Sequence, residues 1–223
     1  MASQKLTYPI SRAASWIGGV ALLLIAILAG VGYFGALAPL ITAGDAAKTA
    51  ADIAGSEPQF RLGVLCMVLA AVLDVIVAAV LLAVLEPVNR MVAVTAAWFR
   101  IAYSAVFVVA ITQLAIVPTL LGEPQSAMNA LESYNVIWRV GLILFAMHLF
   151  LVGYLGFRSG FMPKALAVLI AVAGIGYLVD GLGTVLVADY TPTISTFTFV
   201  GEVALIGWLI WKGSRKRSPV TAA

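Results

Sequence analysis

Long apolar runs, each holding at most one charged residue, alternate with short polar segments along the whole chain. Residues 13–44 contain no Asp, Glu, Lys or Arg, and residues 62–85, 91–118 and 165–188 each contain a single one. A helix needs about 20 consecutive apolar residues to cross the hydrocarbon core of a bilayer. The pattern therefore predicts six transmembrane helices, over residues 16–40, 62–85, 91–118, 138–157, 165–188 and 195–211.

The segments between these runs are too short to form separate domains. Residues 86–90 and 158–164 predict tight turns, since both contain residues that interrupt helices. Asp45 precedes an alanine-rich stretch and predicts the N-cap of a short helix between the first two spans. Residues 119–133 form the longest loop that the pattern predicts.

A cleaved signal peptide is the alternative for the first run, because residues 36–38 read Ala-Leu-Ala. The apolar run before them is longer than the roughly 7–15 residues of a signal peptide, and Pro39 follows directly. We expect a retained helix; cleavage would leave five spans. The expected fold is all-α: residues 1–223 form one integral membrane domain, a six-helix transmembrane bundle with a short external helix, ending in a basic cytoplasmic tail over residues 212–223.

The composition excludes most other classes of protein. Of the 223 residues, 63% are hydrophobic and 10% are charged, whereas a soluble domain has about 25% charged residues. So few charges exclude a soluble enzyme, a nucleic-acid-binding protein and a disordered chain. The single cysteine, Cys66, excludes a disulfide framework and any metal site made of several cysteines.

The distribution of Lys and Arg predicts the orientation, since cytoplasmic segments of membrane proteins are rich in these residues. With the N-terminus inside, three basic residues face outward (Lys48, Arg61 and Arg139) and nine face the cytoplasm (Lys5, Arg12, Arg90, Arg158, Lys164, Lys212, Arg215, Lys216 and Arg217). We therefore expect both termini in the cytoplasm. The lipid bilayer is the expected partner, and the basic tail can also contact anionic lipid, at ~1 kcal/mol per basic residue.

Five ionisable residues lie inside the predicted spans: Asp74, Arg100, His148, Asp180 and Glu202. A charge there costs about 2.5–3.5 kcal/mol to insert, so such residues normally face the interior and find partners. Asp74 lies twelve residues before Glu86, and Arg100 lies ten after Arg90. The mismatch between antiparallel helices is only ~3 Å, so we expect an Asp74–Arg100 ion pair, with a structural role favoured. His148 is expected to be neutral with one hydrogen bond; a proton relay is the alternative.

Asp180 and Glu202 form the second expected pair. If the outer turn centres near Pro192, they lie twelve residues before it and ten after it, so two carboxylates meet at similar depth. Holding both carboxyl groups ionised so close together costs free energy, because like charges repel. A shared proton or a bound cation would make the pair functional, whereas Arg61 or Arg139 reaching inward from the outer rim would make it structural.

The sequence contains only weak signals for a metal or cofactor site. Asp74, Asp180, Glu202 and His148 could in principle ligate a metal, but no H-E-x-x-H or Glu-x-x-His spacing is present, so we expect no metal and no cofactor. Whether the protein is an enzyme stays open, with a non-enzymatic function favoured. An inverted repeat that matches Asp74 with Asp180 and Arg100 with Glu202 is a weaker hypothesis.

Several local patterns share the order and spacing of one known family. They are Gly44–Ala50, Glu57–Gly63, Pro87–Arg90 with Phe99 and Arg100, His148 with Gly153–Pro163, Ala173–Asp180, and Gly201–Gly213. Together they resemble the "domain of unknown function 4386" family of prokaryotic membrane proteins, from the first helix to Gly213. Ala167 stands where the family's pattern has glycine. The resemblance implies a location in a prokaryotic plasma membrane and implies no reaction, substrate or cofactor.

Three functions from different classes follow. The first is a small transporter-like or sensing membrane protein that uses Asp180 and Glu202 as a proton or cation site. The second is an intramembrane metal-assisted enzyme built on His148 and the carboxylates. The third is a structural or accessory subunit whose buried charges hold the bundle together. A water-filled cavity that reaches Asp180 from outside would favour the first function. His148, Asp180 and Glu202 side chains within ligand distance of one another would favour the second, and a dry, fully paired interior would favour the third.

Overall fold

Helices are the only regular elements in the part of the chain that the computed structural model describes, residues 11–191 and 193–215. In chain order they are α1 (Arg12–Gly30), the π-helix η1 (Val31–Leu37), the 3-10 helix η2 (Ala38–Leu40), α2 (Ala46–Gly55), α3 (Glu57–Leu85), α4 (Arg90–Ile116), the 3-10 helix η3 (Val117–Thr119), α5 (Pro124–Arg158), α6 (Lys164–Leu186), α7 (Ser195–Thr198) and α8 (Val200–Ser214).

Among the described residues, five helical segments are long and apolar enough to cross a membrane: Arg12–Leu40, Glu57–Leu85, Arg90–Thr119, Pro124–Arg158 and Lys164–Leu186. The predicted sixth span, over residues 195–211, is not one continuous helix. That stretch is divided at Phe199 into α7, of four residues, and α8, of 15 residues. Fifteen residues rise only about 22 Å, which is less than the roughly 30 Å of a bilayer core.

Local chemistry explains the division of the last segment. Residues 191–198 include four threonines and a serine, which are poor helix formers. The backbone N–H groups of Ile194 and Ser195 donate to the side chain of Asp180, which holds the chain beside α6. α8 then begins against α6: a Cβ on Gly201 would lie 2.3 Å from the Leu169 carbonyl oxygen, so only glycine allows this approach.

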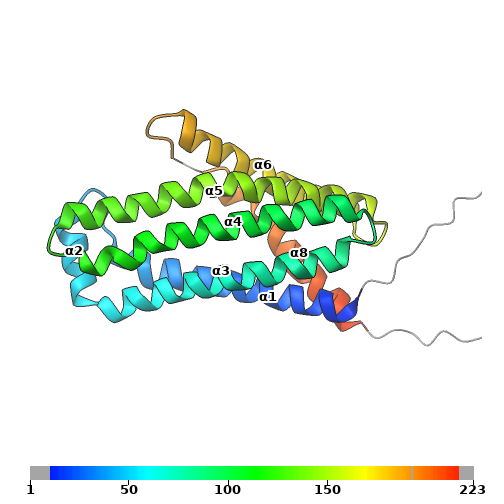
Figure 1. Cartoon of the computed structure of the whole chain (residues 1–223), viewed down its shortest axis with the longest axis horizontal. Coiled ribbons are helices and arrows are strands. Elements are labelled where there is room, and N and C mark those ends of the chain that lie inside the picture. The colour runs from blue at the N-terminus through cyan, green and yellow to red at the C-terminus, as the bar shows by residue number, and fades with distance from the viewer. Residues whose placement is uncertain (1–10, 192, 216–223) are drawn as a thin grey trace, which may run out of the picture.

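The long helices and α8 form a closed ring. α1 packs against α3, α3 against α4, α4 against α5, α5 against α6, α6 against α8, and α8 returns to α1. Figure 1 shows the long helices side by side, with the far half of α6 leaning away from α5. A Cβ on Gly213 would lie 2.5 Å from Trp16 Cβ, so α8 ends beside the start of α1.

The end of the ring opposite the termini carries the predicted external helix. Asp45 caps α2 by accepting from the Lys48 amide at 2.9 Å, as its position before the alanine-rich stretch predicted. The predicted loop over residues 119–133 is wrong in its second half, because α5 already begins at Pro124. The first turns of α5 are helical because their apolar side chains are buried and the turns pack against α2.

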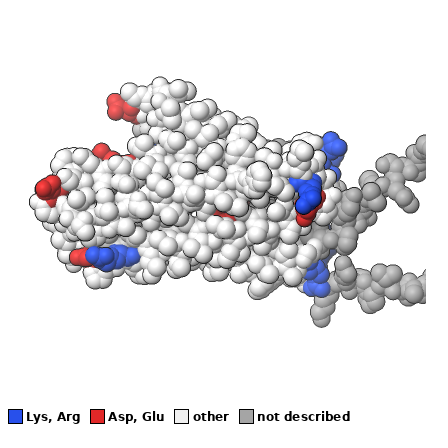
Figure 2. Space-filling view, in the orientation of Figure 1, with Lys and Arg blue, Asp and Glu red and all other residues white. Residues whose placement is uncertain are grey.

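Charged side chains gather at the two ends of the molecule and leave a wide, almost uncharged middle, as Figure 2 shows. The end where α4 and α6 begin is mostly basic, and the opposite end is mostly acidic. Lys5, Lys216 and Arg217, which belong to the nine basic residues predicted on the cytoplasmic side, lie outside the described residues.

Near its end, over Val31–Leu37, the first helical segment is a π-helix rather than an α-helix. Pro39 has no N–H to donate to Gly35, and the Ala38 amide instead bonds to the carbonyl of Tyr33, five residues back. Gly30, Gly32 and Gly35 lower the local preference for an α-helix. Single π-helical turns are frequent at functional sites, and this one lines both cavities described below.

Candidate binding cavity

A cavity of about 530 Å³ lies among the ring helices, and its lining includes the exposed side chains of Phe34 and Val203. All six ring helices contribute side chains to its wall, from Leu22 of α1 to Glu202 of α8. The wall is mostly apolar, and a few polar groups interrupt it. Cavities of roughly 300–1,000 Å³ with this character are the usual sites for small ligands.

Four of the five predicted ionisable residues lie in one layer of the ring. Counted from the helix ends on the side of the termini, Asp74 is 11 residues from Leu85, Arg100 is 10 from Arg90, His148 is 10 from Arg158 and Glu202 is 12 from Ser214. At about 1.5 Å per residue, these depths agree to within about 3 Å. The layer places three charged side chains at the wall of one cavity.

The predicted ion pair between Asp74 and Arg100 is present and fully buried. Arg100 Nη2 donates to Asp74 Oδ1, and the side chains of Arg100 and Asp74 are 4% and 7% exposed, respectively. The guanidinium also lies over the ring of Phe145, with its carbon 5.3 Å from the ring centre. The Nε–H of Arg100 has no hydrogen-bond partner within the described residues. Arg100 is thus neutralised by Asp74, and one of its buried donors is left without a partner among the described residues.

The hydrogen bonds of His148 fix its tautomer. Nδ1 lies 2.9 Å from the carbonyl oxygen of Ala96, and Nε2 lies 3.2 Å from Nη1 of Arg100. A carbonyl can only accept and a guanidinium can only donate, so Nδ1 carries the proton and Nε2 accepts. His148 is therefore a neutral group, as predicted, but it makes two hydrogen bonds rather than one, and it orients Arg100.

Glu202 is the carboxylate of the cavity that forms no ion pair with any residue that the structure describes. It stands in the first turn of α8, where the helix dipole favours a negative charge. The hydroxyl of Tyr177 donates to its Oε1 at 2.5 Å. In the part of the chain that the structure describes, Oε2 accepts no hydrogen bond. One carboxylate oxygen can therefore take a ligand.

Asp180 has a different environment from Glu202, and the two carboxylates do not share a partner. The Asp180 side chain accepts from the Tyr190 hydroxyl at 2.8 Å, the Ile194 amide at 3.3 Å and the Ser195 amide at 2.8 Å. The hydrogen bond to Asp180 raises the pKa of Tyr190. Fully buried Asp180 thus ties the connection after α6 to that helix.

The two arginines considered as neutralising partners do not join the carboxylates. Arg61 pairs with Glu57 one turn away at 2.7 Å, on the surface. Arg139 lines the cavity but forms no ion pair within residues 11–191 and 193–215. It lies 19 residues before the end of α5 and Glu202 lies 12 before the end of α8. Arg139 is therefore roughly 10 Å closer to the opposite end of the ring.

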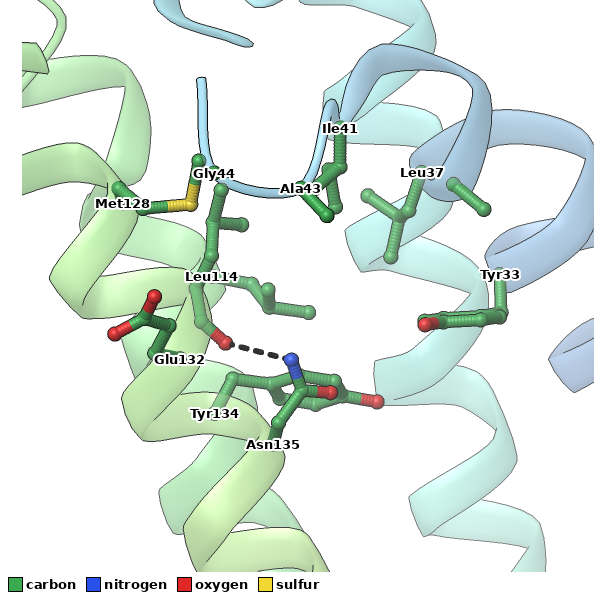
Figure 3. A pocket seen from close by; sticks show the side chains of 12 residues that line it. Tyr33, Leu37, Ile41, Ala43, Gly44, Leu114, Met128, Glu132, Tyr134 and Asn135 are labelled. Carbon is green, nitrogen blue, oxygen red and sulfur yellow. Dashed lines mark hydrogen bonds between the residues drawn. The ribbon is translucent and has the colours of Figure 1, made fainter. Parts of the chain in front are cut away.

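A second cavity, of about 340 Å³, opens near the end that carries α2. In Figure 3, Tyr33 enters from η1 on one side, while Glu132, Tyr134 and Asn135 enter from α5 on the other. Tyr33, Tyr134 and Asn135 also line the central cavity. These three side chains therefore stand between the two cavities.

Sequence reasoning missed three features of this site. Tyr177 lies about one helical turn before Asp180 in the sequence, but its hydroxyl donates to Glu202 instead. Tyr190 and the two backbone amides that satisfy Asp180 come from a connection for which no partner was predicted. Tyr33 gave no sign of its place between the cavities, although the closely spaced glycines around it signal an irregular helix.

Comparisons with known proteins identify a family but no activity. The family model described as "Domain of unknown function (DUF4386)" matches residues 17–213. An uncharacterised protein from Archaeoglobus fulgidus is 36% identical over 151 residues, which make up 68% of this chain and 83% of that protein. No solved structure matches the chain.

Proposed function

The chain belongs to the DUF4386 family, and from this premise we propose that it is a transporter-like or sensing multi-pass membrane protein that binds a small molecule or ion in its central cavity. The observation that carries the proposal is the cavity of about 530 Å³ with Glu202 at its wall. The cation site proposed here uses Glu202 alone instead of a pair with Asp180. In this proposal the Glu202 carboxylate binds either a proton or the positively charged ligand.

The proposed location is a prokaryotic plasma membrane with both termini in the cytoplasm. Five helices suit a bilayer by length and composition, and α7 with α8 would complete the sixth crossing. Basic residues favour the cytoplasmic side. Six described basic residues lie at the end where α1 begins and α8 ends: Arg12, Arg90, Arg158, Lys164, Lys212 and Arg215. Lys48, Arg61 and Arg139 lie farther from that end.

The basic end also suits contact with anionic lipid, which we include in the proposal. Lys212 and Arg215 lie over the ring of Trp211, with their charged groups 5.3 and 4.0 Å from its centre. Such clusters of basic and aromatic side chains are typical of the interface between membrane and water.

The two other functions have less support. A metal-assisted enzyme would need His148 as a ligand, but both of its nitrogens are already engaged. A purely structural bundle would have all interior charges paired, which describes Asp74 and Arg100 but not Glu202.

Labelling with dicyclohexylcarbodiimide tests the proposal without knowledge of the ligand, because this apolar reagent adds to protonated carboxyl groups that it can reach inside a membrane protein. Purified full-length protein should acquire an adduct at Glu202, identified by peptide mass spectrometry, and the adduct should be absent from Glu202→Gln. Asp180, which is 0% exposed, serves as the internal control. No adduct at Glu202, or equal labelling of Asp180, would refute a reachable carboxyl in the cavity.

A further inference from the structure

The wall of the central cavity combines one free carboxylate with an unusual number of aromatic rings. Nine of its 24 lining residues are Phe, Tyr or Trp, whereas these residues make up 10% of the chain. Aromatic faces attract cations through their negative quadrupoles, and the attraction grows when the cation is desolvated. The wall already holds one cation in this way, since Arg100 lies over Phe145.

The charges at the cavity favour a positive ligand at Glu202. Asp74 and Arg100 cancel each other, and His148 is neutral by its hydrogen bonds. Glu202 is left with the neutral hydroxyl of Tyr177 as its donor. Arg139 lies roughly 10 Å away along the ring axis. A cation at the α8 end of the cavity would therefore complete a charge pair that the protein itself leaves open.

The apolar character of the wall favours organic cations over inorganic ions. An inorganic ion needs several oxygen ligands, and no group of three or more Asp, Glu, His or Cys side chains that could hold one occurs within the described residues. Most of the remaining wall consists of aliphatic and aromatic side chains, which contact apolar groups favourably and cannot replace the hydration shell of an inorganic ion. The suited ligand carries its positive charge inside a large apolar body.

We propose that the cavity binds a lipophilic organic cation, an amine or onium ion with aromatic or alkyl substituents, whose charge pairs with Glu202 and whose body contacts the aromatic wall. This inference rests on the proposed function and names the ligand class of the same site. Tyr177 acts as a positioning residue, because its hydroxyl fixes the Glu202 carboxylate toward α6.

The test compares two ions of nearly the same shape and opposite charge, tetraphenylphosphonium and tetraphenylborate. Their binding to the purified full-length protein in lipid nanodiscs is measured by isothermal titration calorimetry, with empty nanodiscs subtracted. Tetraphenylphosphonium should bind at one saturable site, and Glu202→Gln should weaken that binding by at least about tenfold, since a buried charge partner is lost. Glu202→Asp should retain part of the affinity, and Glu86→Gln, on the exposed turn after α3, should leave it unchanged.

Other results would overturn the inference in distinguishable ways. Preferential binding of tetraphenylborate would identify an anion site governed by Arg100 or Arg139. Equal affinity of Glu202→Gln for tetraphenylphosphonium would mean partition into apolar surface alone. If neither ion binds while carbodiimide still labels Glu202, the organic cation is wrong and the reachable carboxyl stands. If labelling fails as well, the proposed function fails with it.

Discussion

Each ionisable side chain of the interior is distinguished by the partners that it finds. Asp74 and Arg100 neutralise each other, and His148 holds the guanidinium from a third helix. Asp180 is satisfied by a hydroxyl and two backbone amides, so it needs no cation. Glu202 lines the cavity, and among the described residues it pairs with no Lys or Arg and its Oε2 accepts no hydrogen bond. A carboxylate thus has a structural role in α6, whereas the carboxylate of α8 is the one that we propose binds a ligand.

The Asp74–Arg100 pair should show strong coupling in a double-mutant cycle. Asp74→Asn or Arg100→Leu alone strands a buried charge and should cost about 3–5 kcal/mol, whereas removing both should cost much less. The measurement is thermal unfolding of the single and double variants in detergent. Additive losses would show that the two side chains do not stabilise each other.

The role of Asp180 predicts a local effect. Asp180→Ala leaves the Ile194 and Ser195 amides without acceptors and should cost about 2–3 kcal/mol. Hydrogen exchange should rise in residues 187–199, with little change in α3 and α4. Tyr190→Phe, which removes one of the three bonds, is the matched milder variant. Unchanged exchange in residues 187–199 would contradict the role assigned to Asp180.

Part of this interior could be predicted from the chain alone. Asp74 and Arg100 stand at nearly equal distances from a tight turn, so their contact followed from the helical rise. The same counting from Pro192 did not reveal the separate donors of Asp180 and Glu202, because it assumed two continuous helices meeting at that turn. The donors to Asp180 are backbone amides and a tyrosine from an irregular connection, and no periodicity marks such contacts.

At the scale of the elements, α8 is the helix whose length matters for the site. Because it begins halfway along the ring, its first turn carries Glu202 to the cavity wall. The apolar content of residues 195–211 met the requirement for a span, so hydropathy could not reveal the division at Phe199. The start of α8 is set instead by close packing on α6, which depends on three-dimensional contacts at Gly201 and Gly176.

Two glycines of α8 should respond in opposite ways to alanine. A Cβ at Gly201 would collide with the backbone of Leu169, so Gly201→Ala should cost about 1–3 kcal/mol. A Cβ at Gly207 meets nothing within 4 Å, so Gly207→Ala should be neutral or stabilise by up to about 1 kcal/mol. The measurement is the thermal unfolding of both variants. Equal changes in stability would refute the packing described for the start of α8.

At the scale of the whole molecule, closure of the ring brings both described ends of the chain together. Five long helices and the divided last segment carry the chain between the two ends of the molecule, and α8 finishes beside α1. The all-helical architecture and the external helix α2 could be predicted, because apolar runs and a capping aspartate are local signals. The cavity could not, since it is the space left when six helices close a ring.

The proposed topology can be measured in cells. A reporter fused after Ala223 should behave as cytoplasmic. Cysteines introduced singly between Gly122 and Asn129, at the acidic end of the molecule, should react with impermeant thiol reagents from outside. Buried Cys66 should not react. Labelling of the introduced cysteines only after lysis would reverse the orientation.

The most direct test of the central claim, a ligand cavity organised around Glu202, is an experimental structure of the full-length protein with tetraphenylarsonium, located by the anomalous scattering of arsenic. The account predicts one peak inside the ring, between the Glu202 carboxylate and the aromatic wall, that is present in the wild type and lost in Glu202→Gln. A peak confined to the outer surface, or one that persists unchanged in Glu202→Gln, would contradict it.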